Sequence, residues 1–171
     1  MRKSAVAKPS VKREYTRASS WCPSPMRPLA RCSRLMLAES LAAAKRLEEG
    51  IEAIDEALAR SARNDERWCT PELLRIKGEL LLQSSHPRAR GQAERLFTES
   101  LEMARQQRAL SWELRIAASI SRLQRANGCI EDGPQLLAGV YSRFTEGFAT
   151  ADLRMAESLL DQFGRRGAAN R

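Results

Sequence analysis

Arg75 and Arg115 have the type and the spacing to bind an anionic group, because they lie 40 residues apart in two segments of similar sequence. A guanidinium group donates paired hydrogen bonds to a carboxylate. Two of them on neighbouring elements could therefore hold an acidic or carboxylate-bearing peptide. The candidate peptide-binding groove consists of Arg75, Glu79, Arg115, Ser119 and Arg122, with Leu35 and Glu39 in the corresponding place nearer the N-terminus. The alternative is that the two arginines pair with Glu72, Glu79 or Glu113 on a solvated helix face.

Residues for catalysis or metal binding are sparse in this sequence. His86 is the single histidine and has no acid beside it, which excludes a histidine-based triad and a two-histidine zinc site. The phosphate-binding patterns G-x-x-x-x-G-K-[ST] and G-x-G-x-x-G do not occur. The acidic pairs Glu48/Glu49 and Glu131/Asp132 open predicted helices, where the helix dipole accounts for them. We therefore expect a protein that is not an enzyme, with no cofactor, no metal and no small-molecule substrate.

The compartment is predicted from the cysteines and from the absence of long apolar runs. Four cysteines are scattered along the chain without a C-x-x-C pair, which favours reduced thiols in a cytoplasm. No run of about 18 apolar residues is present, so we expect no membrane span. The basic start MRKSAVAKPS is not followed by an apolar stretch, which argues against a secretory signal.

The net charge of +8 is confined to the beginning of the chain. Residues 1–34 hold nine Lys or Arg and one acid, whereas the remaining 137 residues hold 20 bases and 20 acids. A neutral main region is not the electrostatic footprint of a DNA-binding domain, so we do not expect nucleic acid as the main partner. The alternative is a nucleic-acid-associated regulator that uses the basic arm, whose binding would weaken steeply with salt.

The elements that must position the candidate groove are helices. Residues 1–29, rich in Pro, Ser, Lys and Arg, are predicted to be a disordered basic arm, and residues 165–171 a frayed tail. Between them, residues 30–164 carry apolar residues at helical spacing. Thr70 and Thr150 are predicted to cap the third and seventh helices. The seven predicted helices cover about 30–44, 48–62, 70–83, 90–107, 110–126, 131–145 and 150–163.

The helices repeat in pairs. Small residues recur at Ala38, Gly78 and Ala118, 40 residues apart each time, and each is followed by a second helix with a similar apolar pattern. Two helices of a hairpin approach closely where the crossing point carries almost no side chain. The segment Pro71–Leu110 has the spacing typical of a tetratricopeptide repeat. We therefore predict an all-α protein built from tetratricopeptide-like helical hairpins, about seven helices in an open right-handed solenoid.

Three segments carry a family resemblance: ERW…ELLRIKGELLL, AERLFTESLEMARQQRALSWELRIAASISRL and LLAGVYSRFTEGFATADLRMAESLLD. They resemble the C-terminal tetratricopeptide-like region of large bacterial signalling proteins. In those proteins, a class III adenylate or guanylate cyclase domain, or a DNA-binding transcriptional domain, precedes a predicted ATPase module and then these repeats. The resemblance covers roughly residues 35–163 and is most specific at Phe-Thr-Glu-Gly-Phe, residues 144–148.

The resemblance implies a sensory or protein-interaction module that has a protein or peptide partner and no catalytic role. The chain departs from the family because it lacks every upstream domain, so no cyclase or ATPase residue can be carried over. We accordingly expect a regulatory module that could be a detached fragment of a larger signalling protein.

Overall fold

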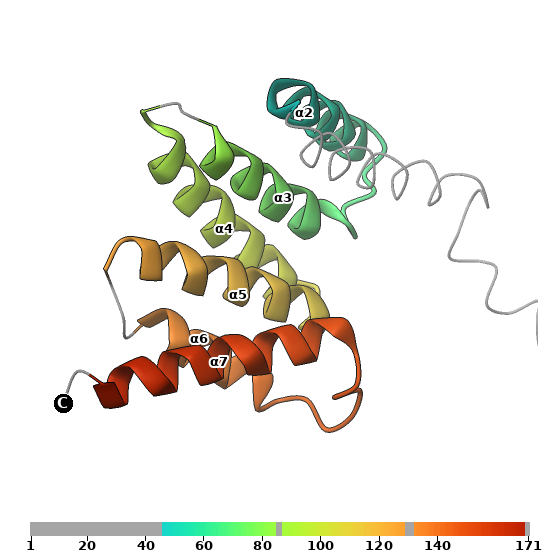
Figure 1. Cartoon of the computed structure of the whole chain (residues 1–171). Coiled ribbons are helices and arrows are strands. Elements are labelled where there is room, and N and C mark those ends of the chain that lie inside the picture. The colour runs from blue at the N-terminus through green and yellow to red at the C-terminus, as the bar shows by residue number, and fades with distance from the viewer. Residues whose placement is uncertain (1–45, 85–86, 129–131, 170–171) are drawn as a thin grey trace, which may run out of the picture. The chain divides into compact units, whose positions relative to one another are not determined.

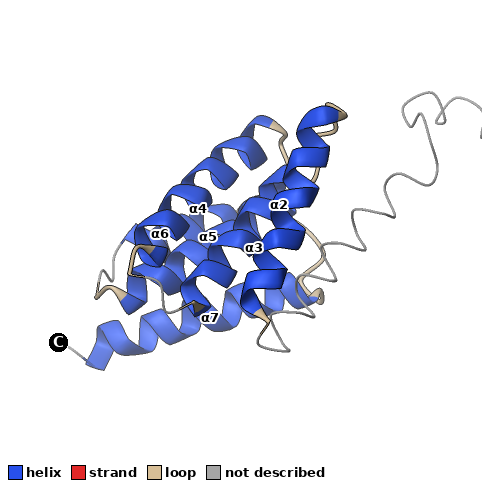
Figure 2. Cartoon of the chain, turned by 90° about the horizontal axis from the view of Figure 1, so that it is seen from above, coloured by secondary structure: helices blue, strands red, loops and turns tan. Residues whose placement is uncertain are grey.

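The computed structural model describes residues 46–84, 87–128 and 132–169. Within these ranges the chain forms six α-helices and no strand, all in one compact unit (Figures 1 and 2). The expected all-α class is thus confirmed for this part of the chain. The helices are α2 (Leu47–Arg63), α3 (Thr70–Gln83), α4 (Ala89–Gln106), α5 (Leu110–Ala126), α6 (Asp132–Tyr141) and α7 (Ala151–Ala169).

Four of the predicted helices agree closely with α2, α3, α4 and α5. The predicted arm at 1–29 and the predicted first helix at 30–44 lie outside the described residues, and so does His86. At the other end, α7 continues to Ala169, beyond the predicted domain boundary at residue 164. Among the described residues, no helix combines the length and the apolar character needed to cross a membrane.

The sixth helix is shorter than predicted, because α6 ends at Tyr141 and not near residue 145. Tight turns replace the helix there: the Arg143 amide donates to the Val140 carbonyl, and the Phe144 amide donates to the Tyr141 carbonyl. Gly147 follows with a φ of 79°, which favours glycine. The apolar spacing of Phe144 therefore reflects packing against the core from a loop and does not mark a helix.

The predicted cap at Thr70 is wrong, because Cys69 occupies the N-cap position and Thr70 is already helical. The Thr70 hydroxyl lies 3.1 Å from the hydroxyl of Ser61 on α2 and thus joins two helices. Thr150, in contrast, directly precedes α7, and its carbonyl accepts the hydrogen bond of the Arg154 amide, 3.1 Å away.

Successive helices pack against each other from α2 to α7, and a second set of contacts joins alternate helices. α3 contacts α5, and α5 contacts α7, whereas no comparable contact joins α2 with α4 or α4 with α6 among the described residues. The helices α3, α5 and α7 therefore form a continuous row. Figure 1 shows α3, α5 and α7 following one another along the stack.

Close helix crossings occur at small residues, as the spacing predicts. A Cβ atom added to Gly78 of α3 would lie 2.6 Å from Cε1 of Phe97 on α4, so the ring packs directly on the backbone. Ala118, one repeat later, is fully buried in a cluster with Leu137 and Val140 of α6. Ala38 lies outside the described residues.

Two buried serines make further contacts at these crossings that the apolar pattern does not reveal. Ser100 of α4 donates a 2.6 Å hydrogen bond to the carbonyl of Pro71 in the first turn of α3. Ser121 of α5 donates a 2.6 Å hydrogen bond to the carbonyl of Gly133 on α6. A Cβ on Gly133 would lie 2.8 Å from Cα of Ser121, so the two helices meet there at backbone distance.

Candidate binding face on α3, α5 and α7

The row formed by α3, α5 and α7 brings together charged side chains from all three helices. Glu72 and Arg75 lie one turn apart on α3, where Arg75 donates two hydrogen bonds of 2.8 Å to the Glu72 carboxylate. Arg115 of α5 donates to the same carboxylate at 2.9 Å and to Asp152 of α7 at 2.8 Å. A continuous set of ion pairs therefore links the three helices.

Glu72 lies at the centre of these ion pairs and is almost inaccessible, with a side chain 1% exposed. Burial alone would raise its pKa, since it disfavours the charged carboxylate, but Arg75 and Arg115 outweigh burial and hold the pKa below its ordinary value. Burial likewise opposes the charge of Arg75, yet Glu72 and Glu79 raise its pKa above the ordinary value. These groups are consequently charged over the whole neutral range.

Arg75 makes all its observed contacts within the chain. Its side chain is 10% exposed, and besides Glu72 it pairs with Glu79 at 2.7 Å. Arg115 is more open, but both of its partners, Glu72 and Asp152, are also internal. This arrangement agrees with the alternative in which the arginines pair with neighbouring acids, although Glu72 and Arg75 are buried and do not lie on a solvated face.

The C-terminal half of the row contains the other predicted groove residues. Ser119 of α5 donates a 2.7 Å hydrogen bond to Oε1 of Glu79 on α3, a residue 40 positions earlier. Arg122 lies 4.0 Å from the same oxygen and donates to the thioether of Met155 on α7. All five predicted residues, Arg75, Glu79, Arg115, Ser119 and Arg122, are thus connected through shared contacts.

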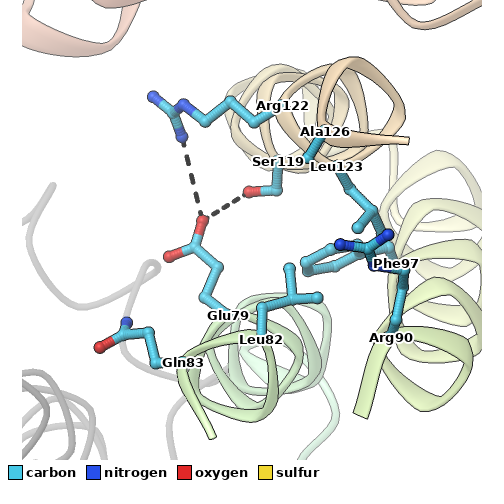
Figure 3. A pocket seen from close by; sticks show the side chains of 9 residues that line it. All are labelled: Glu79, Leu82, Gln83, Arg90, Phe97, Ser119, Arg122, Leu123 and Ala126. Atoms are coloured by element: carbon cyan, nitrogen blue, oxygen red, sulfur yellow. Dashed lines mark hydrogen bonds and ion pairs between the residues drawn. The ribbon is translucent and has the colours of Figure 1, made fainter. Parts of the chain in front are cut away.

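A pocket of about 400 Å³ opens between the C-terminal halves of α3 and α5, beside α4 (Figure 3). Leu82, Phe97 and Leu123 supply its apolar wall, one from each helix. Glu79 and Arg90 lie on opposite sides of the opening in Figure 3, with Leu82 and Phe97 between them. The remaining lining residues are Gln83, Ser119, Arg122 and Ala126.

Sequence reasoning missed several residues of this region. Arg90, Leu82, Phe97 and Leu123 line the pocket, and none of them was among the predicted groove residues. Asp152 was also missed, and its position in the first turn of α7 gives no sign that it pairs with α5. Nothing in the sequence marks such a contact, since the partner is 37 residues away.

A second buried carboxylate, that of Glu113, is paired differently from the prediction. It was a candidate partner of Arg115, but it accepts a 2.6 Å hydrogen bond from Arg143, which follows α6. Its side chain is 1% exposed, so this ion pair holds the α6–α7 connection against the start of α5. Glu113 therefore does not belong to the binding face.

The chemistry that this face can perform is recognition of a polar or charged group. In the part of the chain that the structure describes, no three His, Cys, Asp or Glu side chains gather in a way that could hold a metal ion. Comparisons of the chain with protein-family models, with curated proteins and with solved structures return no match. The resemblance to bacterial signalling proteins stays a prediction.

Proposed function

We propose that the chain is a tetratricopeptide-like, non-catalytic binding module that acts in the cytoplasm and contacts a protein partner through the face of α3, α5 and α7. It would serve as a regulatory or scaffolding module of the kind found in the C-terminal region of bacterial signalling proteins. The observation that carries the proposal is the continuous row of alternate helices, in which α3 contacts α5 and α5 contacts α7.

The ion pairs support this proposal, since they hold the three helices in one arrangement before any partner arrives. Glu72 joins α3 to α5, and Arg115 joins α5 to α7. A surface that is already ordered loses little conformational entropy on binding. The exposed charges that remain, such as Arg122 with 46% of its side chain exposed, are then available to a partner.

Site-specific photocrosslinking tests the proposal. Benzoylphenylalanine replaces Arg122 on the face in one variant and Arg105 of α4, which is exposed and outside the row, in the matched control. The full chain is expressed in the cells that carry it, and adducts are identified by mass spectrometry. We expect one recurrent protein adduct from position 122 and none from position 105. Equal adducts from both positions would contradict the proposed binding face.

A further inference from the structure

The pocket between α3, α4 and α5 has the size and the apolar wall of a small-molecule site. Its volume of about 400 Å³ falls within the range of sites that bind small organic ligands. Phe97 is 1% exposed, so its ring forms a fixed part of the wall. Leu82 and Leu123 contribute apolar surface from the two flanking helices. A compact apolar group can therefore pack against side chains of three helices at this open pocket.

One cationic side chain at the pocket has no acidic partner among the described residues. Glu72, Glu79 and Asp152 balance Arg75, Arg115 and Arg122, with which they share contacts of 2.7 to 4.0 Å. Arg90 also lines the pocket, yet it is exposed and has no hydrogen bond or ion pair with any other described residue. An unpaired guanidinium beside an apolar wall is complementary to a carboxylate attached to an apolar body.

The pocket does not extend along the whole contact between α3 and α5. Towards the N-terminal halves of α3 and α5, the side chains of Glu72, Arg75 and Arg115 fill the contact between the helices. An extended peptide would need that stretch to be open, whereas a compact ligand needs only the pocket. The geometry therefore favours a small molecule over a peptide.

We infer that this pocket binds a small carboxylic acid whose apolar body is about the size of an aromatic ring. The body packs against Leu82, Phe97 and Leu123, and the carboxylate accepts hydrogen bonds from Arg90. This ligand site goes beyond the proposed protein-binding function and needs no protein partner, although Glu79, Ser119 and Arg122 of the binding face also line the pocket.

Titration of the full chain with 4-phenylbutyrate, followed by NMR of labelled leucine methyl groups, tests this inference. We expect shifts at Leu82 and Leu123, and we expect 4-phenylbutyramide, which has the same body without the charge, to bind more weakly. A charge-assisted hydrogen bond at a partly exposed site changes affinity by roughly three- to tenfold. Arg90→Gln should remove that preference for the acid. Arg105→Gln, which changes an exposed arginine of α4 away from the pocket, should leave it intact.

Several results would overturn the inference. Equal affinity of the acid and the amide for the parent chain would show that no cation recognises the ligand. An unchanged preference in Arg90→Gln would assign the charge recognition to another residue. Acetate binding as strongly as 4-phenylbutyrate would mean that the apolar wall contributes nothing. Tighter binding of an acetylated hexapeptide ending in phenylalanine would identify a peptide site. The first three results leave the crosslinking test of the protein-binding face unaffected, whereas a peptide site would agree with it, because Arg122 lines the pocket.

Discussion

Substitution of Gly78 by alanine tests the closest approach between α3 and α4. The new Cβ would lie 2.6 Å from Cε1 of Phe97, closer than real Cβ atoms approach, and 3.0 Å from two further ring atoms. The ring cannot move away easily, because it is 1% exposed and packs with Ala93 and Leu123. Such overpacking costs about 1–3 kcal/mol.

The helical preference of alanine acts in the opposite direction. Replacing glycine by alanine inside a helix stabilises it by about 1 kcal/mol. Gly91 of α4 is the matched control, because a Cβ there would meet nothing within 4 Å. Gly91→Ala should therefore be more stable than the parent, and Gly78→Ala should be less stable than Gly91→Ala by about 1–3 kcal/mol.

Urea unfolding followed by circular dichroism at 222 nm measures this difference. The two variants are also made in a Phe97→Leu background, where the ring is gone and the clash with residue 78 is relieved. In that background the difference between Gly78→Ala and Gly91→Ala should shrink towards zero. If Gly78→Ala stabilises the parent as much as Gly91→Ala does, α3 and α4 do not cross at Gly78 and the reasoning fails.

Three further predictions concern buried polar groups. Glu72→Gln should lower the free energy of unfolding by about 3 kcal/mol in urea titrations, because it leaves Arg75 and Arg115 with an uncharged partner in a buried place; an effect below about 1 kcal/mol would contradict the buried network. Because the folded-state pKa of Glu72 is depressed, its stabilisation is present above the ordinary glutamate pKa and is lost as the pH falls through the lower folded value. Unfolding measured from pH 7 down to pH 2 should therefore show a smaller acid-induced loss in Glu72→Gln than in the parent, and equal losses would mean that this carboxylate is not paired. Ser100→Ala should cost about 0.5–1.5 kcal/mol, since it removes the buried hydrogen bond that Ser100 donates to the Pro71 carbonyl, whereas Ser158→Ala on the exposed side of α7 should change unfolding little.

The spacing of apolar residues predicted most of the helices, because a helix that packs on a core must carry apolar residues at helical spacing on its buried face. Gly78 and Ala118 stand out since a close crossing excludes larger side chains, and the structure confirms both as buried crossing points. The same spacing predicted the end of α6 wrongly. Phe144 has helical spacing, but it packs against the core from a turn that follows the helix. Spacing alone does not distinguish a helical residue from a loop residue that packs on the same core.

The candidate site was predictable only in part. Residues one repeat apart, such as Glu79 and Ser119, could be placed on one face from the 40-residue period. The pairing of Arg115 with Asp152 could not be predicted from the sequence, because it depends on how α7 packs on α5. The burial of Glu72 was equally hidden, since an acid in the first turn of a helix is usually explained by the helix dipole.

Both proposals require that residues 40 apart in sequence meet on one face. The most direct test is a nuclear Overhauser measurement between the side chains of Glu79 and Ser119, whose Oε1 and Oγ atoms lie 2.7 Å apart. The contact between Gly78 and the ring of Phe97 serves as the internal control, because it reports the α3–α4 hairpin alone. We predict a cross-peak for both pairs. A cross-peak between Gly78 and Phe97 without one between Glu79 and Ser119 would show that the hairpin forms but that α3 and α5 do not share a face.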